Sequence, residues 1–238
     1  MAERAMRKST GKRASAAMPK RTANLSVTPT GKRDAARSRR AILDASLIEF
    51  SENGHAGARI DSIAERAGVS KPLIYSYFGD KDALYAAALR EAYIQIRQGE
   101  RELNLDYKDP ETAILDLVAF SLRHFRDKPW FISMLSTENL RGGTTIREMK
   151  DLAVIQSHLI VKLRNVLQRG AQMGIFRQGI EPFDLYISIA SLCYFPIANG
   201  HTLRVVFEVA MDDAWFEKRS VDIGEMILRF LRPGSDDS

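Results

Sequence analysis

Hydrophobic residues recur along this chain at intervals of three and four, the spacing of one face of an α-helix. Leu43, Leu47 and Phe50 share such a face in a helix that we expect to begin near Lys32 and to end at Asn53-Gly54. Stretches in which apolar and polar residues alternate, as they do in half-buried strands, are scarce. The pattern therefore predicts an all-α protein.

Residues 60–67 carry a complete apolar stripe and predict a second, shorter helix. The turn Ala67-Gly68-Val69-Ser70 follows and leads into a third helix over residues 71–78. Gly68 suits the end of a helix because glycine adopts a positive φ angle without strain, and Ser70 suits the N-cap of the next helix. Two short helices joined by a glycine-containing turn predict a helix-turn-helix, whose second helix enters the major groove of DNA. The alternative is an ordinary helical hairpin with tyrosines on its surface.

The outer face of the third helix carries side chains suited to DNA. Lys71 lies at its N-terminal end, and two tyrosine hydroxyls follow within the helix. Lys81 opens the next helix, where the backbone amides and the helix dipole favour a phosphate group. The candidate DNA-binding residues are Arg59, Ser70, Lys71, Pro72, Leu73, Tyr75, Ser76, Tyr77 and Lys81.

Glycine and proline breaks divide the rest of the chain into further helices. We expect a fourth helix to run from Lys81 towards Glu100. The helix-turn-helix domain is then assigned to residues 32–82 and a C-terminal helical domain to residues 83–238. The further helices are expected over about 110–126, 130–140, 144–172, 181–198 and 202–231.

Charge is distributed unevenly along the 238 residues, whose net charge is +5. Residues 1–40 hold 12 Lys or Arg against two acidic residues, whereas the remainder carries a net charge of −5. Residues 1–31 are rich in Ser, Thr, Ala, Lys and Arg and have few large apolar side chains, so we expect a disordered basic arm. Such an arm suits phosphate contact, and the alternative is a tail that is merely solvated.

Cysteine and histidine usage argues against several classes of protein. The single Cys193 excludes an internal disulfide framework, which fits a reducing compartment, and no apolar stretch approaches the length of a membrane span. We therefore expect a cytoplasmic protein. Its four histidines, His55, His124, His158 and His201, lie too far apart for a zinc-binding motif. No nucleophile elbow or phosphate-binding glycine loop occurs, so we expect neither an enzyme nor a bound metal or cofactor.

Specific residues in the helix-turn-helix region resemble a known family. The segments Ile63–Ser70 and Tyr75–Lys81 closely resemble the TetR (tetracycline-repressor) family of bacterial regulators, and the resemblance extends over about residues 36–96. Two positions depart from the family pattern. Arg59 follows an alanine where many members have a threonine that opens the second helix, and Pro72 stands where members often have glycine. The resemblance implies DNA binding, and these departures leave the base contacts open.

The resemblance also implies a role for the C-terminal domain. Members of the family dimerise through their last two helices and enclose a small-molecule pocket, so we expect a homodimeric repressor that an effector releases from operator DNA. Weaker similarity around residues 170–177 and 195–202 implies a small aromatic or carboxylic catabolite as the effector. The alternatives are an architectural DNA-binding protein that depends on the basic arm and a helical enzyme with a borrowed fold.

Apolar and aromatic residues of the later helices provide candidates for both roles, with ordinary core packing as the alternative for each. The candidate pocket residues are Phe125, Trp130, Met134, Asn139, His158, Met173, Phe176 and Cys193. The candidate dimer-interface residues are Leu185, Ile189, Leu192, Phe195, Phe207 and Ile227.

Overall fold

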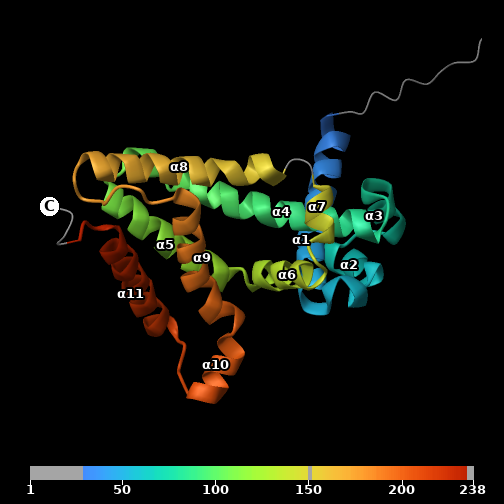
Figure 1. Ribbon diagram of the computed structural model, residues 1–238. Helices are drawn as coiled ribbons and strands as arrows, with labels where there is room; N and C mark the ends of the chain where they lie inside the picture. Colours follow the sequence, from blue (N-terminus) through green and yellow to red (C-terminus); the bar gives the residue numbers. More distant parts are fainter. Residues whose placement is uncertain (1–28, 150–151, 235–238) are drawn as a thin grey trace, which may run out of the picture.

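The computed structural model describes residues 29–149 and 152–234 and contains only helices in these ranges (Figure 1). The prediction of an all-α protein is therefore confirmed. The helices are α1 (Pro29–Gly57), α2 (Ile60–Ala67), α3 (Lys71–Phe78), α4 (Lys81–Glu102), the 3-10 helix η1 (Leu105–Tyr107), α5 (Pro110–Asp127), α6 (Pro129–Leu140), α7 (Thr144–Glu148), α8 (Leu152–Gln172), α9 (Pro182–Ala198), α10 (Gly200–Phe207) and α11 (Asp213–Leu231).

Two of the long helices expected from the sequence are each divided in two. The predicted helix over 144–172 is wrong, because Met149 adopts extended backbone angles and ends α7. The predicted helix over 202–231 is also wrong. Glu208 has a left-handed conformation that ends α10, and the Asp212 carboxylate then caps α11 by accepting a hydrogen bond from the Trp215 amide at 2.9 Å. Neither break occurs at a glycine, so the glycine and proline pattern of the sequence did not predict these two helix ends.

The first helix begins before its expected start and is kinked near its expected end. It begins at Pro29, three residues before the expected start, and it continues past Gly54 to Gly57. Gly54, however, has a φ angle of 65° and a ψ angle of 178°, outside the helical range, so the regular helix ends at Asn53-Gly54 as expected and the residues up to Gly57 form a separate short helical segment beyond the kink. Most of the expected basic arm, residues 1–28, lies outside the described residues.

The long helix α4 connects the two halves of the molecule (Figure 1). Its N-terminal turns pack with α1, α2 and α3 around buried Phe50, Ile63 and Ile74. Its C-terminal turns pack against α5 and α8. The expected domain boundary at residues 82 and 83 therefore lies within the first turn of a continuous helix.

Helix α6 leaves the C-terminal half and lies across α1 (Figure 1). The hydroxyl of Ser133 in α6 donates a hydrogen bond to the backbone oxygen of Ser51 in α1, at 2.6 Å. The two halves are thus joined by packing between helices as well as by the continuity of α4. A displacement of α6 would act directly on the helix that supports α2 and α3.

Among the described residues, no helix combines the length and the apolar character needed to cross a bilayer.

Candidate nucleic-acid interface

Helices α2 and α3 form the expected helix-turn-helix. Gly68 has a φ angle of 65° and a ψ angle of 35°, and the amides of Val69 and Gly68 donate to the oxygens of Ala64 and Glu65 at 3.0 and 3.1 Å, which closes α2 with a Schellman motif. Ile63 and Ile74 face the core from the two helices and are almost completely buried. The local sequence therefore determines both the turn and the faces that the two helices bury.

The N-terminus of α2 is capped from another helix. The buried carboxylate of Glu49 in α1 accepts a hydrogen bond from the Arg59 amide at 2.9 Å. This contact satisfies the amide of the N-cap residue itself, whereas a threonine side chain at the N-cap would accept from amides further into the first turn; the Arg59 side chain is exposed to solvent. Sequence reasoning missed Glu49, because the contact spans ten residues and crosses the kink at Gly54.

The outer face of α3 is open to solvent. Lys71, Pro72, Tyr75 and Ser76 are exposed, whereas Leu73 and Tyr77 are half-buried. Ser70 is the N-cap residue by its backbone, with φ −80° and ψ 146°, but its hydroxyl makes no capping hydrogen bond. Pro72 lies in the first turn, where a missing amide proton costs nothing. The serine hydroxyl thus remains free for another partner.

Basic side chains stand at both ends of α3. Lys71 forms an ion pair with Asp61 of α2 at 3.0 Å, and the hydrogen bond to this carboxylate raises the pKa of the lysine. At the other end, the Lys81 ammonium donates to the backbone oxygen of Ala56 at 3.1 Å. The guanidinium of Arg39 in α1 lies over the Phe78 ring at 4.5 Å. Sequence reasoning missed Arg39, because only the folded chain brings this part of α1 beside α3.

All nine candidate DNA-binding residues therefore lie on one continuous segment, from the N-terminus of α2 through α3 to the first residue of α4. Their exposure and positive charge suit a phosphate backbone, while α3 projects polar and apolar groups of the sizes that contact base edges.

A cavity of about 320 Å³ lies in the other half of the molecule, between α4, α5, α6 and α9. Five of the eleven residues in its wall are aromatic, and Arg97 is also among them, so we call it the aromatic cavity. Of the eight candidate pocket residues, only Phe125 and Asn139 line this cavity. The aromatic residues of the wall are Tyr93, Phe125, Phe131, Tyr186 and Tyr194.

The other six candidate pocket residues do not line this cavity. Met134 and Cys193 are completely buried, and Phe176 packs its ring against Gly170. Met173 and His158 are exposed to solvent. Trp130 lies instead beside the Lys128 ammonium, 5.7 Å from it. Residue type alone did not distinguish cavity from core, because Met and aromatic residues serve both.

Burial alters the acid–base behaviour of two groups near the cavity. Burial, with the positive charges of Lys128 and Arg97, lowers the pKa of His124 to about 4, so this imidazole is neutral at pH 7. Burial raises the pKa of the Cys193 thiol to about 12, and its sulfur contacts the backbone oxygen of Val118 at 3.7 Å. Cys193 is therefore a packed thiol and not a reactive one.

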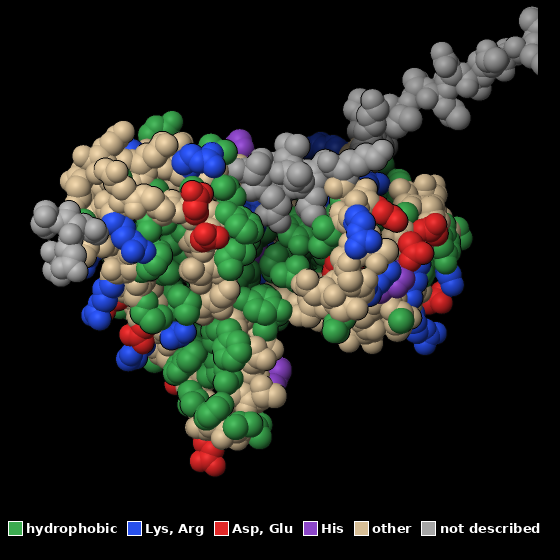
Figure 2. All heavy atoms as spheres, in the orientation of Figure 1, with side chains coloured by type: hydrophobic (Ala, Val, Ile, Leu, Met, Phe, Trp, Pro, Cys, Tyr) green, Lys and Arg blue, Asp and Glu red, His purple; other side chains and the backbone are tan. Residues whose placement is uncertain are grey.

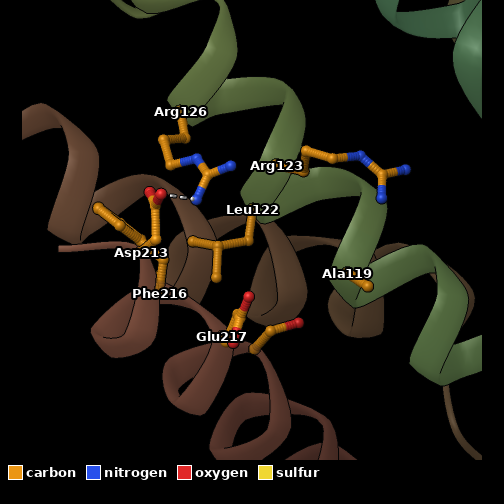
Figure 3. A pocket seen from close by; sticks show the side chains of 8 residues that line it. Ala119, Leu122, Arg123, Arg126, Asp213, Phe216 and Glu217 are labelled. Carbon is orange, nitrogen blue, oxygen red and sulfur yellow. Dashed lines mark hydrogen bonds and ion pairs between the residues drawn. The ribbon is translucent and has the colours of Figure 1, made fainter.

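A second hollow, of about 310 Å³, lies between α5 and α11 (Figure 3). Arg126 and Asp213 face one another across it at 3.4 Å, and the Arg126 guanidinium also lies 5.6 Å from the centre of the Phe216 ring. Arg123 points away from this pair (Figure 3). Because its central charges already have partners, this hollow suits a small-molecule ligand less well than the aromatic cavity does.

The candidate dimer-interface residues divide between the core and the surface. Leu185, Ile189 and Ile227 are at most 3% exposed within a single chain, so they pack in its core. Phe195 and Phe207 are 58% and 66% exposed, and Leu192 is half-buried. Hydrophobic side chains gather over α9 and towards α10, which projects from the body at the end of α9 (Figures 1 and 2).

Comparisons with known proteins identify similar sequences for both halves. The family described as "Bacterial regulatory proteins, tetR family" matches residues 42–88, and "Tetracyclin repressor-like, C-terminal domain" matches residues 110–227. The HTH-type transcriptional repressor NicS of Pseudomonas putida is 38% identical over 197 residues, which are 82% of this chain and 93% of NicS. The HTH-type transcriptional regulator RutR of Escherichia coli K12 is 30% identical over 210 residues, which are 87% of this chain and 97% of RutR.

Solved structures share the architecture at lower identity. The transcriptional regulator SCO4942 from Streptomyces coelicolor superimposes with a TM-score of 0.62 at 22% identity, covering 82% of this chain and 99% of that one. FadR from Bacillus subtilis, in complex with stearoyl-CoA, superimposes with a TM-score of 0.61 at 18% identity, covering 82% of this chain and all of FadR. At these identities the likeness concerns the fold alone.

Proposed function

The chain belongs to the TetR family of DNA-binding transcriptional repressors, which are not enzymes, and on this premise we propose that it acts as a homodimer released from its operator by a small-molecule effector. The evidence for DNA binding in this proposal is the solvent-exposed outer face of α3, which has basic side chains at both ends. We place the protein in the cytoplasm, where it would bind its operator DNA.

In the proposed complex α3 enters the major groove. Ser76 and Tyr75 face the bases, and Arg59, Lys71 and Lys81 contact phosphate groups on either side. The Lys71 ammonium forms an ion pair with Asp61, so part of the positive charge of Lys71 is already neutralised before DNA binds. Base contacts would come chiefly from the middle of α3, because Pro72 offers neither an amide donor nor a polar side chain.

The dimer would form through exposed apolar side chains of α9 and α11. A single recognition helix of eight residues contacts few base pairs, and a two-fold dimer doubles that contact. Half-site centres should then lie about 34–36 Å apart, or a multiple of this distance. The exposed residues that we assign to this interface are Phe183, Ile187 and Phe195 of α9 and Met226 and Phe230 of α11, with Phe207 of α10 beside them.

The aromatic cavity is the proposed effector site. Phe131, Leu135 and Asn139 contribute to its wall from α6, and Ser133 of the same helix contacts Ser51 of α1. A ligand that prefers a shifted α6 would favour a state in which the two recognition helices are wrongly spaced for successive grooves. The ligand can change the equilibrium only by the difference between its affinities for the two states.

Selection of bound fragments from genomic DNA tests the proposal, followed by footprinting of the recovered site and by measurement of protein mass in solution. We expect a two-fold symmetric site and a dimeric mass. A monomer that protects one half-site would contradict the dimer, and the absence of any protected site would contradict the assigned DNA-binding surface.

A second candidate function, ligand-independent architectural binding, rests on the twelve Lys or Arg residues within the first 40. Removal of residues 1–28 distinguishes the two functions. A specific repressor should keep its preference for the operator and lose mainly salt-sensitive affinity, whereas an arm-dependent binder should lose nearly all binding.

A further inference from the structure

We propose that helix α10 is a dimerisation arm that packs against the second copy of this chain, at the start of the partner subunit's α9 and the end of the partner subunit's α11. The two-fold axis of the dimer gives two such contacts, one for each arm. This inference rests on the proposed homodimer and names the element that joins its two subunits.

Helix α10 (Gly200–Phe207) buries almost nothing within its own chain. Gly200 is its one buried residue, and among the described helices α10 packs mainly against α9, from whose end it projects (Figure 1). An isolated helix of eight residues is unstable in water, and two adjacent valines lower its helical propensity further. Helix α10 therefore needs another surface to stabilise it.

The side chains that α10 presents to solvent are apolar. Val205, Val206 and Phe207 are consecutive, and they are 79%, 68% and 66% exposed. Single apolar residues on a surface are common, but an adjacent group on a projecting helix is typical of an interaction surface. The hydrophobic surface over α9 continues towards α10 (Figure 2). A subunit that covers the outer face of α9 can therefore cover α10 as well.

The base of the arm is attached to the body of the subunit. Met211, four residues beyond α10, is buried, and its backbone oxygen accepts a hydrogen bond from the Arg204 guanidinium at 3.5 Å. Glu208 turns the chain back towards the body with a φ angle of 54°, a left-handed conformation that residues other than glycine disfavour. An arm that is already positioned loses little conformational entropy when a partner binds to it.

The exposed surface of α9 and α11 alone is small for a stable dimer. Seven residues of α9 and nine of α11 are exposed, and a standard interface takes about 20–30 residues from each partner. Helix α10 contributes six more exposed residues that are continuous with α9. The arm thus brings the interface close to the usual size of a specific one.

The symmetry that DNA binding requires determines where the arm lies on the partner. Both copies of α3 must face the same DNA, so the two-fold axis runs along the long direction of the molecule, which α4 follows (Figure 1). Helix α9 crosses this direction (Figure 1). Because a two-fold rotation reverses every direction perpendicular to its axis, the two α9 helices run antiparallel where they face each other. Helix α10, which follows the end of α9, therefore meets the start of the partner subunit's α9.

That end of the α9–α11 layer carries exposed apolar side chains of its own. Phe183 lies at the start of α9, and Met226 and Phe230 lie near the end of α11. Both regions lie away from α10 (Figure 1). In the antiparallel dimer each arm covers this apolar group on the other subunit, so both surfaces become buried by one contact.

Sedimentation equilibrium of the full chain over a range of concentrations measures the dissociation constant of the dimer. Val206→Asp should raise this constant at least tenfold, because a charge replaces an apolar group that the partner would bury. Val221→Asp is the matched control, since Val221 is also exposed but lies on the side of α11 opposite Phe230. Circular dichroism should show that both variants stay folded. An equal rise in the two variants, or none in Val206→Asp, would overturn the proposal.

Oxidative cross-linking tests where the arm lies. Val206→Cys is combined in one chain with Phe183→Cys, Met226→Cys or Phe230→Cys, while the native Cys193 is buried. Helix α9 is about 25 Å long, and a disulfide needs Cα atoms within about 7 Å, so cysteines at opposite ends of the layer cannot pair within one subunit.

We expect a covalent dimer from at least one of the three double variants. No single variant should form one, because the two copies of each position lie at opposite ends of the antiparallel interface. A covalent dimer from Val206→Cys alone would place the two arms side by side and overturn the proposal. Failure of all three double variants to cross-link would overturn it as well.

The homodimer and the arm can be tested separately. A parent chain that remains monomeric at all concentrations would contradict the homodimer itself. Replacement of residues 201–208 by a glycine–serine segment of the same length removes the arm and leaves α9 and α11 in place. A dimer that is undiminished by this replacement would retain the proposed function and overturn the role of α10.

Discussion

The hydroxyl of Ser133 in α6 bonds the backbone oxygen of Ser51 in α1, and this contact links the wall of the aromatic cavity to the helix that supports the DNA-binding face. Because α6 contributes Phe131 and Leu135 to the cavity, a single helix contacts both the candidate effector cavity and the helix on which α2 and α3 pack. Communication between the regions therefore requires no long chain of intermediate residues.

Substitution Ser133→Ala should lower the free energy of unfolding by about 1 kcal/mol, the usual contribution of one hydrogen bond. It should also weaken the effect of a bound ligand on operator affinity, since α6 loses a direct attachment to α1. Urea denaturation and fluorescence anisotropy measure the two effects. Ser188→Ala is the control, because this exposed serine bonds only the backbone oxygen one turn earlier, at Asp184. Equal behaviour of the two variants would contradict the linking role.

Substitution Lys81→Met should weaken binding to every DNA sequence by a similar factor. If Lys81 neutralises one phosphate, the slope of log affinity against log salt should fall by about 0.9 in magnitude. Anisotropy with operator and unrelated DNA across salt concentrations gives this slope. Lys218→Met, which removes an exposed ammonium from α11, serves as the control and should leave the slope unchanged. An unaltered slope in Lys81→Met would contradict the proposed contact between Lys81 and a phosphate group.

Tyr77→Phe tests the hydroxyl of a half-buried tyrosine whose ring packs against the core. The phenylalanine keeps this packing, so the free energy of unfolding should change by less than about 0.5 kcal/mol. We expect this hydroxyl to contact a phosphate group, so affinity should decrease for operator and unrelated DNA alike. A loss confined to the operator would indicate a base contact instead.

Substitution Glu49→Ala should destabilise the fold by about 1–3 kcal/mol, because it leaves the amide of Arg59 without its acceptor and a space in the core. Operator affinity should fall with it, since α2 loses its N-terminal anchor. Glu52→Ala, which removes only an exposed ion pair with Arg66, should change stability by less than about 1 kcal/mol. Similar losses in both variants by urea denaturation would contradict the capping role.

Stability should depend on His124 below neutral pH. Its folded pKa of about 4 lies below the ordinary value of 6.5, so the unfolded chain binds the additional proton between these values. The folded state consequently loses stability as pH falls from 6.5 towards 4. His124→Phe, placed among the rings of Phe120 and Phe131, should reduce this dependence by up to about 1 kcal/mol per pH unit.

The control for this measurement is His201→Phe, because His201 is exposed. Glu100 opposes His124 in part, since its raised pKa makes the folded state the stronger proton acceptor between about pH 4.5 and 7. Comparing each variant with the parent chain removes this common contribution. An unchanged slope in His124→Phe would show that the imidazole does not titrate differently in the two states.

Local features were predictable where their physical cause lies within a few residues. The limits of α2 and α3 follow from an apolar stripe, a glycine in the left-handed region and an N-cap serine, all within residues 60–78. The breaks at Met149 and Glu208 were missed, because neither residue type ordinarily ends a helix. Helix existence could thus be predicted, while some helix limits depended on tertiary packing.

The all-α class, the helix-turn-helix and the polarity of its outer face could be predicted from residue patterns alone, because helical periodicity and turn chemistry are short-range. The capping of α2 by Glu49, the place of Arg97 in the wall of the cavity and the burial of Leu185 and Ile227 within one chain follow from the packing of the whole fold. These outcomes depend on which faces of distant helices meet. An apolar side chain has the same character in a core, a cavity wall or an interface, so its position is set by packing across the whole fold.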